Sequence, residues 1–167
     1  FFYPLDAIDN WNRIYGKNGF TQYQFILPLE TSYVGLEEIL KSISSSGKGS
    51  FLAVLKLYGK ANENYLSFPM EGYSLALDFK IEKGLFELLD KLDEIVLKYK
   101  GRIYLTKDVR VSKETFEKGY PFINKFRSLR EKYRMKKKFN SLQSKRDSAS
   151  HFSSSLFWFL FSIIFSS

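Results

Sequence analysis

The chain has 167 residues, 44% of them hydrophobic and 18% aromatic, which suits one packed domain and excludes a disordered composition. It contains no cysteine, so disulfides and thiolate chemistry are excluded, and the single histidine, His151, argues against a His-based triad or a multi-His metal site. The formal net charge is +8, and much of the excess lies between residues 125 and 146.

Hydrophobic periodicity and turn residues predict strands that alternate with helices along the chain. The predicted elements, in order, are a helix over residues 6–15, a strand over 20–27, a helix over 36–43, a strand over 51–58, a short strand over 65–68, a strand over 73–79, a helix from 85 that Gly101 ends, a strand over 102–105, a short helix from 112 and a helix over 121–134. The chain starts at Phe1 within structured-looking sequence, so we expect it to be a fragment that lacks upstream residues.

Two of these elements carry specific predictions about burial. The strand over 51–58 is nearly all apolar except for Lys56, which predicts a central strand. The helix from 85 has a continuous leucine-rich stripe, and its acidic residues, Asp93 among them, are predicted to face water.

The order strand, helix, strand, strand, helix, strand is that of the split βαβ, or ferredoxin-like, unit. We therefore expect an α+β fold: a four-stranded antiparallel sheet with both long helices on one face, followed by C-terminal helices. The other face of such a sheet is open and must be covered by another domain, a ligand or water.

Alternation along the strands predicts which side chains reach the open face. On the strand over 73–79 these are the small or polar residues Ser74, Ala76 and Asp78, because the bulky residues between them should pack on the helices. Two glutamines, Gln22 and Gln24, are expected on the same face. The pattern fits both a solvated face and a face that binds a polar ligand.

On this open face, Lys56 and the Tyr104/Thr106 side of the last strand are expected beside the glutamines. Lys107 is expected just past the end of that strand, where a cation can meet a ligand. Most lysines in such places are simply solvated, so Lys107 gains weight only from its neighbours.

Several ordered motifs resemble FAD-dependent oxidoreductases of the vanillyl-alcohol-oxidase type, and within them the decaprenylphosphoryl-β-D-ribose oxidase and aldonolactone oxidase group. They are the stretch Phe-Tyr-Pro-Leu-Asp at 2–6, Trp-Asn-Arg-Ile-Tyr-Gly at 11–16, Gly-Phe-Thr-Gln-Tyr-Gln-Phe at 19–25, Ser-Phe-Leu-Ala-Val-Leu-Lys at 50–56, Leu-Ser-Phe-Pro at 66–69 and Tyr-Leu-Thr-Lys-Asp at 104–108. The resemblance covers residues 1–146, and several motifs at compatible spacings are more specific than any one of them.

The resemblance implies roles for individual residues. Lys107 resembles the lysine near the flavin pyrimidine edge and the substrate, and a cation there would stabilise the negative charge that develops when hydride arrives. Tyr104 resembles the tyrosine beside the flavin ring. The residues that resemble the lining of the substrate pocket are Gln22, Gln24, Lys56, Ser74 and Ala76.

This chain also departs from the family's pattern. Ser74 and Ala76 stand where the polyprenyl-sugar oxidase has an asparagine and a cysteine, which leaves the substrate open. The sequence contains no Gly-rich phosphate-binding loop and no histidine suited to covalent flavin attachment, and in this family the FAD-binding domain lies upstream. We therefore expect that residues 1–146 form the substrate domain and that this chain alone neither holds FAD tightly nor turns over substrate.

Residues 147–167 form an atypical tail, rich in serine and then in apolar residues, that is not expected to be part of the fold. The apolar run over 156–165 is shorter than a membrane span. A frameshift or read-through product and a membrane-surface anchor both remain open as explanations of this tail.

A second hypothesis is a basic ferredoxin-like module that binds RNA or an anionic membrane surface. Against RNA, the strand over 73–79 lacks the Lys/Arg-Gly-aromatic pattern that stacks bases, and the basic residues cluster in the last helix. We therefore expect no nucleic-acid partner. A cytoplasmic enzyme that associates peripherally with the inner face of the membrane would suit a polyprenyl-phosphoryl sugar.

The sequence does not identify the proton acceptor that oxidation of an alcohol requires. Asp78 and Asp108 can be considered as an acid–base pair, although aspartates at strand edges more often form salt bridges or turns.

Overall fold

The computed structural model describes residues 9–135 and 138–148. Its elements are the 3-10 helix η2 (Trp11–Tyr15), strand β1 (Phe20–Pro28), helix α1 (Leu29–Ser45), strands β2 (Ser50–Tyr58) and β3 (Gly72–Lys80), helix α2 (Leu85–Lys98), strand β4 (Arg102–Ile103), and helices α3 (Lys113–Gly119), α4 (Ile123–Lys132) and α5 (Leu142–Ser148). The predicted start of the first helix at residue 6 and the tail from residue 149 lie outside the described residues. Helix α5 crosses the predicted boundary between 146 and 147.

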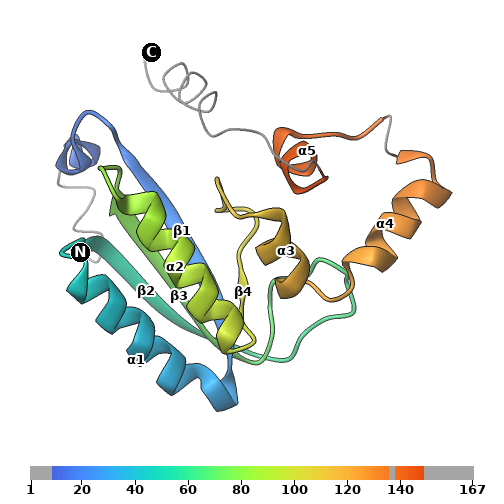
Figure 1. Cartoon of the computed structure of the whole chain (residues 1–167), viewed down its shortest axis with the longest axis horizontal. Coiled ribbons are helices and arrows are strands. Elements are labelled where there is room, and N and C mark those ends of the chain that lie inside the picture. Colours follow the sequence, from blue (N-terminus) through green and yellow to red (C-terminus); the bar gives the residue numbers. More distant parts are fainter. Residues whose placement is uncertain (1–8, 136–137, 149–167) are drawn as a thin grey trace.

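The four strands form one antiparallel sheet in the order β2-β3-β1-β4. Helices α1 and α2 lie side by side over one face of this sheet, while α3, α4 and α5 extend beyond its β4 edge (Figure 1). This arrangement confirms the predicted α+β fold with a ferredoxin-like split βαβ order.

The core lies between the sheet and the two long helices. Every second residue of β1 and β3 points into it, as period-two alternation requires, and α2 contributes one leucine-rich stripe. Its main members are Tyr23, Phe25 and Leu27 from β1, Leu75, Leu77 and Phe79 from β3, Ile39 and Ile43 from α1, and Leu85, Leu88, Leu89, Leu92 and Val96 from α2.

The prediction of a central strand over 51–58 is wrong, because β2 lies at an edge of the sheet and pairs only with β3 among the described residues. Its apolar side chains are largely exposed. The predicted strand over 65–68 is also absent. These residues belong to the connection 59–71, whose buried Phe68 packs against Tyr104 beyond β1, with ring centroids 4.5 Å apart.

Two further predictions need correction. Strand β4 ends at Ile103, two residues earlier than predicted, although the Tyr104 N–H still donates a 2.8 Å hydrogen bond to the Gln24 carbonyl. Asp93 does not face water: its side chain is buried because it lies beside the apolar stripe of α2 and meets Arg110 there.

Candidate functional site

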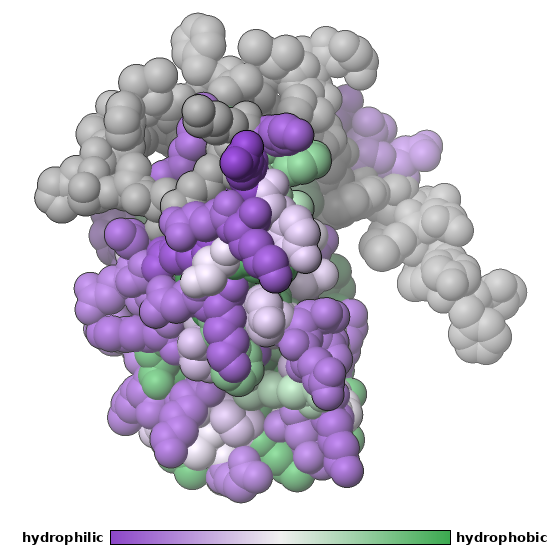
Figure 2. All heavy atoms as spheres, turned by 90° about the vertical axis from the view of Figure 1, so that its right-hand side faces the viewer, coloured by the Kyte–Doolittle hydropathy of each residue, from purple (hydrophilic) through white to green (hydrophobic). Residues whose placement is uncertain are grey.

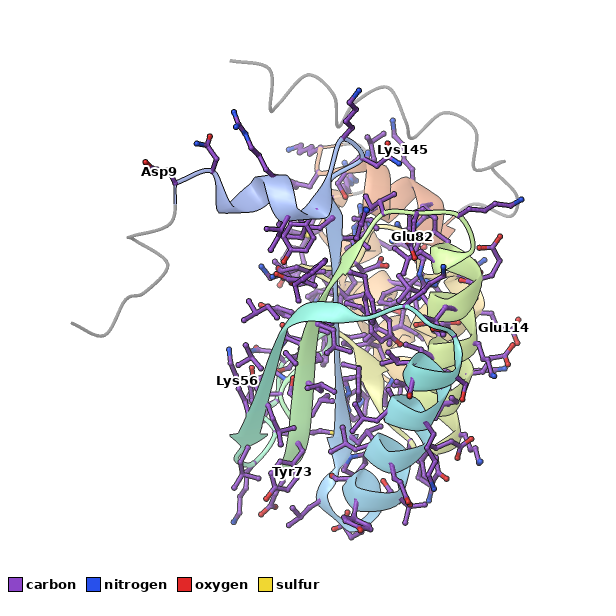
Figure 3. All side chains as sticks on the ribbon, turned by 90° about the vertical axis from the view of Figure 1, so that its left-hand side faces the viewer. Asp9, Lys56, Tyr73, Glu82, Glu114 and Lys145 are labelled. Carbon is purple, nitrogen blue, oxygen red and sulfur yellow. The ribbon has the colours of Figure 1, made fainter. Side chains whose placement is uncertain are left out.

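The predicted site residues come together on the sheet face opposite α1 and α2. In the strand register Gln22 pairs with Asp78, Gln24 with Ala76, and Lys56 with Ser74. Cross-strand partners point to the same side of a sheet, so these side chains form one surface across β1, β3 and β2. Figure 3 shows Lys56 on β2 directed away from the helices. We call Gln22, Gln24, Lys56, Ser74, Ala76 and Tyr104 the polar face.

A hydrogen bond links the centre of the polar face across two strands. Gln24 Nε2 donates to Ser74 Oγ over 3.1 Å, and both side chains are buried. Ala76 and Gln22 are half-buried beside them, and Lys56 is exposed. This centre combines amide and hydroxyl groups with one small side chain, and among its residues Gln22 and Ala76 are the partly exposed ones that border the buried Gln24–Ser74 pair.

Tyr104 and Lys107 extend the polar face past the end of β4. The Lys107 N–H donates to the Tyr104 carbonyl over 3.0 Å, which closes a turn directly after the strand. Lys107 is exposed, and together with Gln22 it lines a small depression beside the N-terminal part of β1, which β4 leaves unpaired. The structure therefore places Lys107 just past the strand, as predicted, at the rim of the polar face.

Two aromatic side chains cover the ends of this sheet face. At one end Tyr15 of η2 is buried against Phe51 and donates a long, 3.5 Å hydrogen bond to Asp78 Oδ2. At the other end Phe68 packs between Tyr58 and Tyr104. The residues of the polar face lie between these two aromatic side chains.

Arg102 was not predicted as part of the site. Its cross-strand partner is Ile26, so it shares the polar side of the sheet, and its Nη1 donates to the Ser67 carbonyl over 2.8 Å. Burial lowers the pKa of its guanidinium. The buried Nε of Arg102 has no hydrogen-bond partner among the described residues. The sequence signal that could have identified Arg102 is its place two residues before Tyr104, which puts both side chains on the same face of a strand.

A buried ion pair ties the segment that carries Lys107 to α2, and it too was missed. Arg110 holds Asp93 through two hydrogen bonds, each 2.9 Å long. Tyr23 OH donates to Asp93 Oδ1 over 2.9 Å. Burial, and next the negative charge of Asp93, raise the pKa of Tyr23 well above its ordinary value, so its hydroxyl keeps the proton that it donates.

Asp108 also stabilises the segment that carries Lys107. Its Oδ1 accepts from the backbone N–H groups of Arg110 and Val111, at 2.9 and 2.7 Å. Its Oδ2 forms an ion pair with Arg146 of α5. These contacts are the turn and salt bridge that strand-edge aspartates commonly form, and they leave Asp108 unsuited to act as an acid or base with Asp78.

Neither metal ligation nor a membrane span emerges from the described part of the chain. Within residues 9–135 and 138–148, no group of three or more His, Cys, Asp or Glu side chains could hold a metal ion. Over the same residues, every helix is too short or too polar to cross a bilayer.

No protein-family model matches the chain. Over 130 residues, or 78% of its length, it is 44% identical to decaprenylphosphoryl-beta-D-ribose oxidase of Mycolicibacterium smegmatis, of which it spans 28%. It is also 35% identical over 96 residues to an uncharacterised protein from the mprA 5′ region of Streptomyces coelicolor, of which the match covers 26%. The chain thus spans little more than a quarter of either relative. It is a homologue of part of an oxidoreductase, which confirms the resemblance predicted from its motifs.

Proposed function

We propose that the chain forms the substrate-side part of an FAD-dependent oxidoreductase that oxidises an alcohol group of a sugar by hydride transfer to flavin. The substrate would be of the polyprenylphosphoryl-ribose type or the aldonolactone type. The observation that carries this proposal is the polar face with Lys107 at its rim, in a chain homologous to a sugar oxidase. Residues 1–146 would make up this substrate domain.

The residues fit the ring end of FAD better than its phosphate end. A flavin ring is flat with polar edges, and FAD, when bound, would supply the hydride acceptor. Tyr104 offers a half-buried aromatic surface, and Lys107 offers an exposed ammonium that can lie against a polar ring edge. The sequence has no Gly-rich loop for the pyrophosphate. A separate FAD-binding domain of the same protein is therefore part of the proposal.

The polar face also suits a sugar substrate. Gln22 and Gln24 carry amides that both donate and accept hydrogen bonds, as sugar hydroxyls require. Lys56 is an exposed cation on the same face and matches a phosphate group. Because a polyprenyl chain lies in a membrane, the proposed enzyme would be cytoplasmic and associate peripherally with the inner membrane face.

The proposal includes no nucleic acid. Two of the basic side chains of α4 are engaged in contacts within the chain. Arg127 forms an ion pair with Glu117, and Arg130 Nη2 donates to the Phe139 carbonyl over 2.7 Å. Figure 2 shows a hydrophilic surface on the side of α3 and α4, but these helices lie beyond the β4 edge and away from the polar face.

The experiment uses a chimera in which the matched stretch of the Mycolicibacterium smegmatis oxidase is replaced by that of this chain. The chimera is purified, its flavin spectrum is recorded, and decaprenylphosphoryl ribose is added without oxygen. We expect bound FAD that the substrate bleaches. Lys107→Ala should slow the bleaching at least about tenfold, because a lost charged contact at a reacting group is worth about 1.5–3 kcal/mol.

The control is Lys60→Ala, which removes an exposed lysine of the connection 59–71. It should bleach like the unsubstituted chimera. A chimera that binds FAD but is never reduced by the sugar-lipid or by an aldonolactone would refute the proposed function. Equal rates for the two lysine variants would refute the role of Lys107 alone.

A further inference from the structure

Strand β2 combines a free edge with apolar side chains on both faces. In its register with β3, Leu55 and Leu57 share the helix side of the sheet with Leu75 and Tyr73, while Val54 lies on the opposite side with Ala76. The exposed fractions are 36% to 64%. We call the residues concerned the β2 surface: Phe51, Leu52, Val54, Leu55 and Leu57.

Exposed edges of this kind are usually protected. Natural edge strands are short, or carry charges, prolines or bulges that prevent pairing with another strand. Strand β2 has nine residues and no proline, Lys56 is its only charged residue, and its one register shift lies at the start, between Ser50 and Leu52. The rest of the strand is therefore open to pairing.

The distribution of apolar residues indicates what covers β2. A ligand or a single helix would cover one face and leave the other, as well as the backbone edge, in water. A strand that continues the sheet would satisfy the edge, and the layers on either side of it would cover both faces. Strands covered on both faces are the ones that have nearly continuous apolar sequence.

Helix α1 carries a matching feature. Tyr33 and Leu40 are exposed, and at about 100° per residue they lie on the side of α1 opposite Glu38. Glu38 binds Lys98, the last residue of α2, and Tyr99 directly after it, so the exposed pair faces away from α2. A further helix beside α1 would cover it, and such a helix is what an extended sheet would require.

We propose that the free edge of β2 pairs with a strand from the part of the oxidase that lies outside the matched stretch, so that the sheet continues beyond this chain. This rests on the proposed function. More than two thirds of the related oxidase lies outside the matched stretch and can supply the strand. A second copy of this chain suits the edge less well, since each copy carries a net charge of +8 and a lysine, Lys56, in the middle of β2.

Backbone hydrogen exchange tests the proposal without any substitution. The β2 amides that point to the free edge should exchange rapidly in this chain alone. In the chimera the same amides should exchange at least about tenfold more slowly, because they become hydrogen-bonded within a sheet. Unchanged exchange of all β2 amides in a chimera that holds FAD would overturn the proposal.

A pair of matched variants tests the apolar faces. Leu55 and Val34 are 55% and 52% exposed in this chain, but Val34 lies on α1, on the side of that helix opposite its buried residues. Leu55→Lys should cost the chimera at least tenfold in FAD retention during gel filtration, and Leu55→Ala less. Val34→Lys should retain FAD like the unsubstituted chimera, and equal losses from the two lysine variants would count against the proposal.

The two proposals fail in distinguishable ways. A chimera with protected β2 amides that the sugar never reduces contradicts the function but supports the pairing. A reducible chimera with unprotected β2 contradicts the pairing alone. Light scattering of this chain on its own provides the remaining outcome: a dimer that Leu55→Lys disrupts and Val34→Lys does not would assign β2 to a second copy and overturn the proposed partner.

Discussion

Arg110 and Asp93 form a two-pronged ion pair between the segment that carries Lys107 and helix α2, with both N–O distances at 2.9 Å. Asp93 is 3% exposed, so its charge depends on this partner. Arg110 lies three residues after Lys107, and the carboxylate of Asp108 holds its backbone N–H. The ion pair thus fixes the position of the segment that carries Lys107, the proposed catalytic lysine.

Asp93→Asn should destabilise the chain by up to about 3–5 kcal/mol, because it leaves the charge of the largely buried Arg110 with only the exposed carboxylate of Asp90 as a partner. The matched change is Asp90→Asn. Asp90 also contacts Arg110, but its side chain is 68% exposed, and exposed pairs contribute about 1 kcal/mol or less. Urea unfolding of both variants measures the difference. Similar midpoints for the two would show that the buried pair contributes no more than the surface pair.

The rate of flavin reduction gives a second test of the Arg110–Asp93 ion pair, because this pair holds the segment that carries Lys107. In the chimera, Arg110→Lys keeps a positive charge but loses the forked geometry that matches a carboxylate. We expect slower flavin reduction with little change in FAD content, since Lys107 would move relative to the flavin ring. If reduction stays at the unsubstituted rate while stability falls, the pair is structural only.

Gly101 allows β4 to lie against β1. A Cβ at this position would contact the Ile26 carbonyl oxygen and come within 2.6 Å of Leu27 Cδ2. Backbone atoms cannot move aside cheaply, so Gly101→Ala should cost about 1–3 kcal/mol. Gly59→Ala is the control, because its Cβ would meet no atom within 4 Å. Thermal unfolding compares them, and equal melting temperatures would contradict the close approach.

Buried tyrosines should make the chain sensitive to alkaline pH. Burial raises the pKa of both Tyr23 and Tyr120 above the ordinary value of 10.0. A pKa raised on folding contributes stability that is fully present below the unfolded pKa and is lost as pH rises above it. Between pH 10 and 11 each tyrosine should therefore cost about 1 kcal/mol of stability, and the slope should approach about 1.4 kcal/mol per pH unit above pH 11.

The measurement is urea unfolding of wild type and Tyr120→Phe at pH 8 and pH 10.5. The free energy of unfolding should fall more steeply in the wild type, since the phenylalanine variant has lost one group that the unfolded chain ionises. Parallel pH dependence in the two proteins would show that Tyr120 ionises as readily in the folded state as in the unfolded one.

The sequence predicted the sheet and the polar face because both depend on alternation. Gln22, Gln24, Ser74 and Ala76 could be assigned to one face from their strand positions, since period two allows only two answers and the bulky neighbours identify the core side. The four-stranded antiparallel sheet with both long helices on one face followed from the order of elements, although the central place predicted for the strand over 51–58 did not. Their roles toward flavin and sugar stay predictions that the chimera tests.

The features that the sequence did not predict depend on contacts between distant residues. Asp93 has an ordinary position for a solvated helix residue, and only the path of the chain after β4 brings Arg110, seventeen positions later, against it. The strand over 51–58 has the composition of a central strand but lies at an edge here. That mismatch is the physical basis for assigning β2 a partner strand.

Lys56 allows the two proposed substrate classes to be distinguished. It is exposed on the polar face, opposite Ser74, where its ammonium could meet a phosphate. In the chimera, Lys56→Ala should raise KM for a polyprenylphosphoryl sugar about tenfold or more, because a hydrogen bond to a charged group is worth about 1.5–3 kcal/mol. An aldonolactone carries no phosphate, so its KM should change little.

Comparing KM for the two substrates shows which part of the substrate Lys56 contacts. Lys60→Ala, just beyond the end of β2, removes a neighbouring exposed lysine and corrects for a general loss of positive charge. A selective rise in KM for the phosphorylated substrate assigns Lys56 to its phosphate. An equal rise for both substrates would mean that Lys56 contacts the sugar itself, and no rise for either would place the substrate elsewhere on the face.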